Sequence, residues 1–220
     1  AREFDNSSAT ARVLTNLGLV AIERDELSKA DRFLTGALDI SRQSGDKNGM
    51  AEALRWLADL AILRQRYEVA EGLCRESLTI FRGLAMSGYI SNLLARLGVC
   101  YLLMDRIEEA NGFLAESLRL AQSLDFTERY FGIVGDFAHL ASVQHQPELA
   151  ARLWGAAERA REAVGMSLTP ADRLIQDHFI HLACQQIDEP IFEAVWAEGR
   201  EMALEEAVAC AVEMSRLVRS

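Results

Sequence analysis

Three side chains that can bind a transition metal follow one another at three-residue steps near the C-terminus: His178, His181 and Cys184. Imidazole nitrogen and thiolate sulfur are ligands that zinc takes in proteins. Residues three apart lie near one another on a helix, but a third ligand at the same step has rotated away from the first. The sequence offers no clear fourth ligand, so we predict no metal site and no other cofactor.

Covalent catalysis needs a nucleophile, a base and a group that orients the base. No GxSxG serine motif, no GxxxxGKS/T phosphate-binding loop and no GxGxxG occurs in the sequence. An all-α enzyme would instead show a deep polar pocket with strongly perturbed ionisable groups. We predict that the chain is not an enzyme, since its four histidines all lie in helical patterns: His139, His145, His178 and His181.

The composition excludes several classes of partner. The 220 residues carry a formal charge of -10, and a surface this acidic repels phosphate backbones, so we expect no direct contact with nucleic acid. No apolar run of about 18 residues occurs, so we predict no membrane span and a cytoplasmic location. The four cysteines are predicted to be buried free thiols: Cys74, Cys100, Cys184 and Cys210.

A gap-free repeat of 40 residues is the strongest pattern in the chain. Side-chain size is kept at each phase, and one phase holds alanine in all four repeats. The matched positions are Leu14, Leu54, Leu94 and Val134; Leu17, Leu57, Leu97 and Phe137; Gly18, Ala58, Gly98 and Ala138; Ala21, Ala61, Tyr101 and Ala141; Ala30, Ala70, Ala110 and Ala150; Leu34, Cys74, Leu114 and Trp154; Ala37, Ser77, Ser117 and Ala157.

Each repeat is predicted to fold as two antiparallel helices. In the first repeat a polar break at residues 24–26 separates two apolar stripes. Small residues such as Gly18 and Ala30 allow the two helices to approach closely. One hairpin cannot bury its apolar surface alone, so neighbouring hairpins must stack, and we expect an all-α array without β-sheet. The first-helix stripe, predicted to face its own hairpin, consists of Val13, Leu14, Leu17, Val20 and Ala21.

These small and large positions resemble the tetratricopeptide (TPR) pattern over residues 10–160. The usual TPR period is 34 residues, and the 40-residue spacing is similar to the longer variant of large bacterial signal-transduction ATPases. Residues 153–158, 168–173, 192–200 and 204–208 resemble segments that follow such arrays in ATP-dependent (STAND-type) transcriptional regulators of the maltose-activator, LuxR and AfsR-like kind. The resemblance implies a right-handed α-α superhelix that senses an effector or binds a protein partner.

The predicted organisation has three parts: residues 1–9 as the tail of a preceding repeat, residues 10–160 as four TPR-like repeats, and residues 161–220 as C-terminal capping helices. Ala1 and Arg2 have the phase of Ser41 and Arg42, which predicts that the chain is a fragment of a longer protein. Thr127, or alternatively Asp125, is predicted to cap the helix that follows.

The first helices are more apolar than a single contact face requires. In TPR arrays the first helices line the concave surface, which implies a groove that suits a protein, a peptide or a small effector. An alternative is that the same residues contact adjacent hairpins or are covered by the C-terminal helices. A second functional hypothesis is a scaffold that self-associates as a homodimer without an effector. The predicted partner-binding residues are Leu19, Ile22, Arg55, Asp59, Ile62, Leu63, Val99, Leu102, Leu103, His139 and Ser142.

Overall fold

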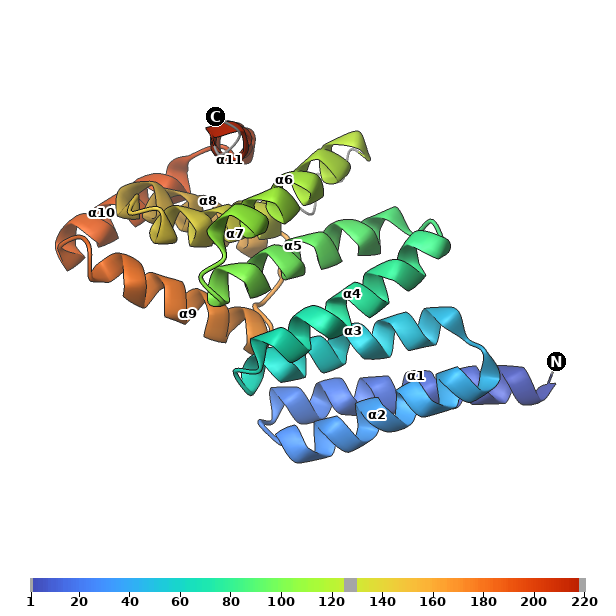
Figure 1. Ribbon diagram of the computed structural model, residues 1–220. Helices are drawn as coiled ribbons and strands as arrows, with labels where there is room; N and C mark the ends of the chain where they lie inside the picture. The colour runs from blue at the N-terminus through green and yellow to red at the C-terminus, as the bar shows by residue number, and fades with distance from the viewer. Residues whose placement is uncertain (1, 125–129, 218–220) are drawn as a thin grey trace. The chain divides into compact units, whose positions relative to one another are not determined.

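The computed structural model describes the chain at residues 2–124 and 130–217, and in these ranges it contains eleven α-helices and no strand (Figure 1). Successive helices pack as antiparallel pairs, so the predicted all-α hairpin array is confirmed. The predicted caps Thr127 and Asp125 lie outside the described residues. The helices are α1 (Arg2–Glu23), α2 (Leu27–Ser44), α3 (Lys47–Leu63), α4 (Tyr67–Gly83), α5 (Ser87–Leu103), α6 (Ile107–Ser123), α7 (Tyr130–Val143), α8 (Pro147–Ala163), α9 (Pro170–Cys184), α10 (Glu189–Glu201) and α11 (Leu204–Leu217).

The chain divides into two compact units, Ala1–Leu93 with Thr169–Ala171 and Leu94–Leu168 with Asp172–Ser220. Residues 2–9 lie in α1, in one helix with residues 10–23. The domain boundaries at residues 9 and 160 therefore stay predictions. No helix in the described part of the chain combines the length and the apolar character needed to cross a membrane.

The turn inside each hairpin repeats its geometry every 40 residues. The last loop residue before the helix-capping position has a positive φ each time: 58° at Asp25, 55° at Gln65, 57° at Asp105 and 58° at His145. Four residues after the capping position comes the invariant alanine, which is fully buried in all four repeats. Its N–H donates to the capping residue's carbonyl oxygen at 3.0 Å in every case. The predicted equivalence of the repeats is confirmed at these positions.

Glycine makes room for leucine where the two helices of a hairpin cross. A Cβ atom on Gly18 would lie 2.7 Å from Cγ of Leu34, and one on Gly98 would lie 2.7 Å from Cγ of Leu114. Carbon atoms pack best at roughly 3.5–4 Å. The two crossings, α1 with α2 and α5 with α6, therefore need a residue without a side chain.

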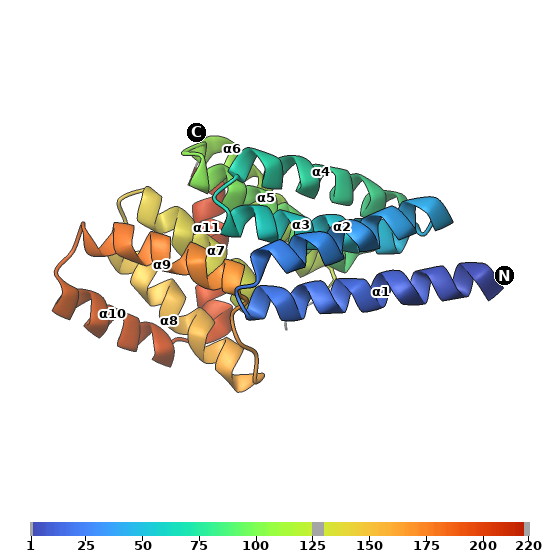
Figure 2. The ribbon, with the colours of Figure 1, turned by 90° about the horizontal axis from the view of Figure 1, so that it is seen from below.

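In the first unit the hairpins α1–α2 and α3–α4 lie next to each other along the chain, as Figures 1 and 2 both show. One apolar cluster joins Ala21 and Ile22 of α1 to Leu34 of α2 and Leu60 of α3. A second joins Leu38 of α2 to residues of α3. Both helices of the first hairpin thus pack on α3, which is how the second repeat buries the face it turns toward the first.

In the second unit α7 and α8 form a hairpin, and α10 packs along α8. At that crossing a Cβ on Gly155 would lie 2.2 Å from the carbonyl oxygen of Trp196, and one on Gly199 would lie 2.1 Å from that of Arg152. Gly199 lies inside α10. It is there because only glycine permits this backbone contact.

Candidate functional site

The eleven predicted partner-binding residues are all buried or half-buried, six of them in the first unit and five in the second. Seven are buried and four are half-buried, because neighbouring helices cover them. Ile22 and Leu63, for example, belong to the cluster that joins α1, α2 and α3. The buried residues are Ile22, Asp59, Ile62, Val99, Leu102, His139 and Ser142, and the half-buried ones are Leu19, Arg55, Leu63 and Leu103. Their role as partner-binding residues stays a prediction.

The C-terminal helix α9 covers the part of this surface that α7 provides. Gln186, just beyond α9, donates from Nε2 to the carbonyl oxygen of Ser142 at 3.0 Å. The imidazole of His139 stacks on Phe179 of α9, with 4.9 Å between ring centroids and 27° between planes. These contacts help to bury His139 and Ser142, two of the predicted partner-binding residues.

The buried His139 and the half-buried Asp136 are neighbouring titratable groups on α7. Nδ1 of His139 lies 3.7 Å from Oδ1 of Asp136, and the two side chains are 8% and 22% exposed. Burial raises the pKa of Asp136 to about 7 and lowers the pKa of His139 to about 3, since each group loses the hydration that favours its charged form. The nearby ion pair of Arg96 and Asp172, 2.6 Å apart, adds smaller effects of both signs to both pKa values.

A carboxyl group with a pKa near 7 beside a histidine has the acid–base properties of many active sites. Here the imidazole is enclosed by two aromatic rings. Phe179 stacks on it, and the ring centroid of Trp154 lies 5.8 Å from that of His139. Neither of its ring nitrogens has a hydrogen-bond partner among the described residues. We therefore interpret Asp136 and His139 as core groups that make stability depend on pH, rather than as a catalytic pair.

The two pKa shifts act on stability in opposite directions. The folded state keeps Asp136 protonated above the pH at which the unfolded chain releases that proton, so this group lowers stability as pH rises from about 4 to 7. The folded state keeps His139 neutral where the unfolded chain binds a proton, so this group raises stability as pH rises from about 3 to 6.5. Over the shared range the two contributions oppose each other.

The histidine and cysteine triplet of α9 lies on the surface. His178, His181 and Cys184 are all exposed, and His181 Nε2 lies 3.1 Å from Nε2 of Gln185. Within the described ranges no three histidine, cysteine or acidic residues are grouped so as to hold a metal ion. The prediction that all four cysteines are buried is wrong for Cys184, which is exposed, and for Cys210, which is half-buried, because each lies on a helix face left uncovered.

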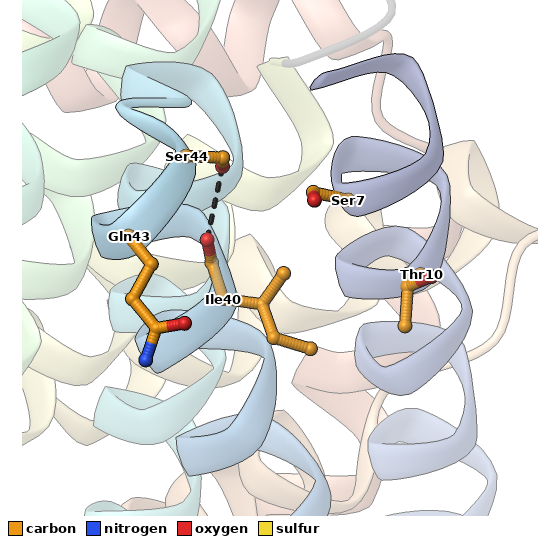
Figure 3. Close-up of a pocket in the computed structure, with 5 residues that line it drawn as sticks. All are labelled: Ser7, Thr10, Ile40, Gln43 and Ser44. Atoms are coloured by element: carbon orange, nitrogen blue, oxygen red, sulfur yellow. Dashed lines mark hydrogen bonds between the residues drawn. The ribbon is translucent and has the colours of Figure 1, made fainter. Parts of the chain in front are cut away.

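A shallow pocket of about 270 Å³ opens between α1 and α2 (Figure 3). Hydroxyl, amide and alkyl groups line it. The hydroxyl of Ser44 donates a hydrogen bond to the carbonyl oxygen of Ile40 at 2.9 Å. The lining residues are Ser7, Thr10, Ile40, Gln43 and Ser44. None of these five is an acid, a base or a cysteine, so the pocket offers no group for acid–base or nucleophilic chemistry.

A row of large apolar side chains on α1 is exposed, and we call it the α1 stripe. It consists of Val13 (56% exposed), Leu17 (42%) and Val20 (49%). The prediction that these three face their own hairpin is wrong. Leu14 and Ala21 of the predicted set do pack against neighbouring helices.

The α1 stripe corresponds to buried positions in every later repeat. Forty residues on, Ala53 and Leu60 are buried on α3 against the first hairpin, and Leu57 is half-buried there. The equivalents in the third and fourth repeats are all buried: Leu93, Leu97, Cys100, Ile133, Phe137 and Leu140. In the second repeat the preceding hairpin covers the equivalent face, and the α1 stripe has the same phase in the first repeat. The signal that could have revealed it is this alignment of repeats, not the spacing within α1.

Comparison with protein-family models adds one finding: residues 49–123 match the model described as Tetratricopeptide repeat. These residues form a tetratricopeptide repeat region. The TPR region spans α3 to α6 and so covers the second and third of the four repeats. It does not reach residues 153–208, which carry the narrower resemblance to bacterial regulators. A search of curated proteins finds no match to the chain. TPR regions are typically protein-interaction modules and are generally non-catalytic.

Proposed function

We propose that this chain is a protein-interaction module, non-catalytic in itself, that binds a partner through the α1 stripe. One observation carries the proposal: Val13, Leu17 and Val20 are exposed at positions whose equivalents are covered in each later repeat. Large apolar side chains that share one face and touch water mark interaction surfaces. The TPR region gives the same functional class independently.

The wider role that we propose is the sensing arm of a larger bacterial ATP-dependent transcriptional regulator. Support comes from the regulator-like segments. Residues 153–158 lie in α8 and residues 192–200 lie in α10, and these two segments meet where the helices cross. Trp154 and Trp196 stack there with 6.0 Å between ring centroids. Arg200 from the same segments pairs with Glu162 at 2.7 Å. In such a role, a partner that binds one state of the array better shifts the attached domains toward that state.

The binding proposal is tested by displaying the folded chain to a library of amphipathic helical peptides and hairpins. We expect selected ligands to lose binding to a Leu17→Asp variant, because a charge in the α1 stripe opposes apolar burial. Val69→Asp is the matched control, since Val69 is equally exposed (51%) but lies on α4. Ligands that bind both variants alike, or no ligand at all for the folded chain, would contradict the proposal.

A second candidate function is a scaffold that self-associates without an effector, because the same α1 stripe can pair with a second copy. Light scattering separates the two functions. A concentration-dependent dimer that Leu17→Asp abolishes, and that no helical ligand dissociates, would favour the scaffold. The regulator role is tested by the coding sequence that flanks the chain, where a phosphate-binding loop and a DNA-binding helix-turn-helix are expected.

A further inference from the structure

The register of the repeats also defines the chemistry of the partner, if the α1 stripe is the binding surface proposed above. We infer that the α1 stripe takes an antiparallel helical hairpin that packs as α1 and α2 pack on α3, and that this hairpin presents a carboxylate to Arg24. The apolar part of the contact and the polar part rest on separate observations.

The apolar part follows from the face of α3 that corresponds to the α1 stripe. Leu60 lies in one cluster with Ala21 of α1 and Leu34 of α2. Ala53 lies in a second cluster with Leu38 of α2. Both helices of the preceding hairpin therefore contact α3. A single helix would cover only part of such a face, so the matching occupant of the α1 stripe has two helices.

The polar part follows from an arginine that stands at the end of the first helix in each of the first two repeats. Arg64 caps the C-terminus of α3. Its Nη1 lies 2.9 Å from Oδ2 of Asp31 and its Nη2 donates to the carbonyl oxygen of Leu27 at 3.2 Å. Both partners lie in the first turns of α2, in the preceding hairpin. Arg64 therefore binds the beginning of the second helix of that hairpin.

Arg24 stands one 40-residue period before Arg64, directly after α1, and its side chain is exposed. It has the position from which Arg64 binds Asp31. A hairpin on the α1 stripe would therefore bring the first turns of its second helix to Arg24. The same phase holds Met104 and Gln144 in the third and fourth repeats, so this arginine belongs to the first two repeats and is not a general feature of the array.

One further difference shapes the partner. Glu23 occupies the phase of Leu63, which packs against the cluster of α1, α2 and α3. A partner hairpin therefore meets a carboxylate where α1–α2 meet a leucine. We expect a polar or basic side chain of the partner at this point, beside the acidic one that faces Arg24.

The experiment supplies a hairpin of known sequence. A copy of residues 1–46 is joined directly to Ser7 of the chain, which keeps the 40-residue spacing and provides the Gly45–Asp46 turn between the copied hairpin and α1. In this extended chain the copied Asp31 faces Arg24. We expect a higher Tm than in the original chain, and we expect Val20 to become buried, as read by slower amide hydrogen exchange in α1.

The polar contact is tested by Arg24→Ala in the original chain and at the same residue of the extended chain, while Arg24 of the copied hairpin is left unchanged. We expect the substitution to lower the Tm of the extended chain by about 3 °C and that of the original chain by less than about 1 °C. Exchanging the charges, Arg24→Asp with Asp31→Lys in the copy alone, should restore most of the loss. Arg12→Ala is the control, because Arg12 is also an exposed arginine on α1. Its equivalent in the second repeat, Glu52, contacts the following repeat and not the preceding one, since it accepts a hydrogen bond from Tyr89.

Three results would overturn the inference. The first is an extended chain that is no more stable than the original. The second is an Arg24→Ala effect of equal size in both chains. The third is a dimer of the original chain that Leu17→Asp dissociates, since a second copy would then be the occupant. The binding proposal has its own failure, namely a folded original chain that takes no helical ligand, so the two can fail separately.

Discussion

Replacing Gly155 with alanine should destabilise the protein although alanine is the better helix former. The added Cβ would lie 2.2 Å from the carbonyl oxygen of Trp196 and 2.9 Å from the amide nitrogen of Arg200. Both contacts are with backbone atoms of α10, which cannot rotate away as a side chain can. To restore a normal contact, α8 and α10 must separate by roughly 1 Å, which forfeits a quarter to a half of the attraction between the facing atoms.

The expected size follows from two opposing terms. Overpacking of this kind costs about 1–3 kcal/mol, and more where backbone must move, whereas alanine gains about 1 kcal/mol over glycine inside a helix. We expect Gly155→Ala to lower the free energy of unfolding by about 2 kcal/mol. Gly112→Ala is the control, because Gly112 lies inside α6 with nothing within 4 Å of the added Cβ, and it should raise stability by up to about 1 kcal/mol.

Urea unfolding followed by tryptophan emission measures both variants. Trp154 and Trp196 stack at the same crossing, so their emission should also change in the folded Gly155→Ala protein. Circular dichroism provides a second signal that does not depend on the tryptophans. A Gly155→Ala variant as stable as the wild type, or stabilised as much as Gly112→Ala, would refute the argument that glycine is needed for the close approach of α8 and α10.

Three further predictions concern other parts of the chain. Leu97→Asp, at a fully buried position, should cost several kcal/mol, whereas Leu17→Asp at the same phase should cost less than about 0.5 kcal/mol; thermal melts compare them. In urea melts from pH 4 to 6.5, Asp136→Asn should make stability rise more with pH than in the wild type, and His139→Phe should make it fall, because each variant removes one of two opposing contributions; equal slopes would contradict this. A thiol reagent should label the exposed Cys184 in the folded protein and the two fully buried thiols only after unfolding.

The hairpin architecture could be predicted from the sequence because its determinants are local. Small residues at the crossing, such as Gly18 and Ala30, and the polar break between the helices recur at a constant spacing. A leucine opposite Gly18 and one opposite Gly98 complete the same crossing in two repeats. Each of these features is decided within about 20 residues along the chain, which is the range that periodicity describes.

The surfaces of the array could not be predicted in the same way. The apolar spacing of Leu17 and Leu97 is the same, yet one is exposed and the other is fully buried. Burial of His139 depends on Phe179 of α9, which lies after the four predicted repeats. Periodicity states that a face is apolar, but it does not state which neighbour covers that face.

The binding proposed for the α1 stripe would also change the stability of the array. In a stacked array the stability of each hairpin comes largely from its nearest neighbours. The first hairpin packs against α3 of the second hairpin, whereas the α1 stripe is exposed. A hairpin that docks on the stripe would add a contact of the kind that already stabilises the second repeat. A ligand whose free concentration is 100 times its dissociation constant adds about 2.7 kcal/mol to the free energy of unfolding. The proposed partner binding would therefore order the first hairpin most strongly.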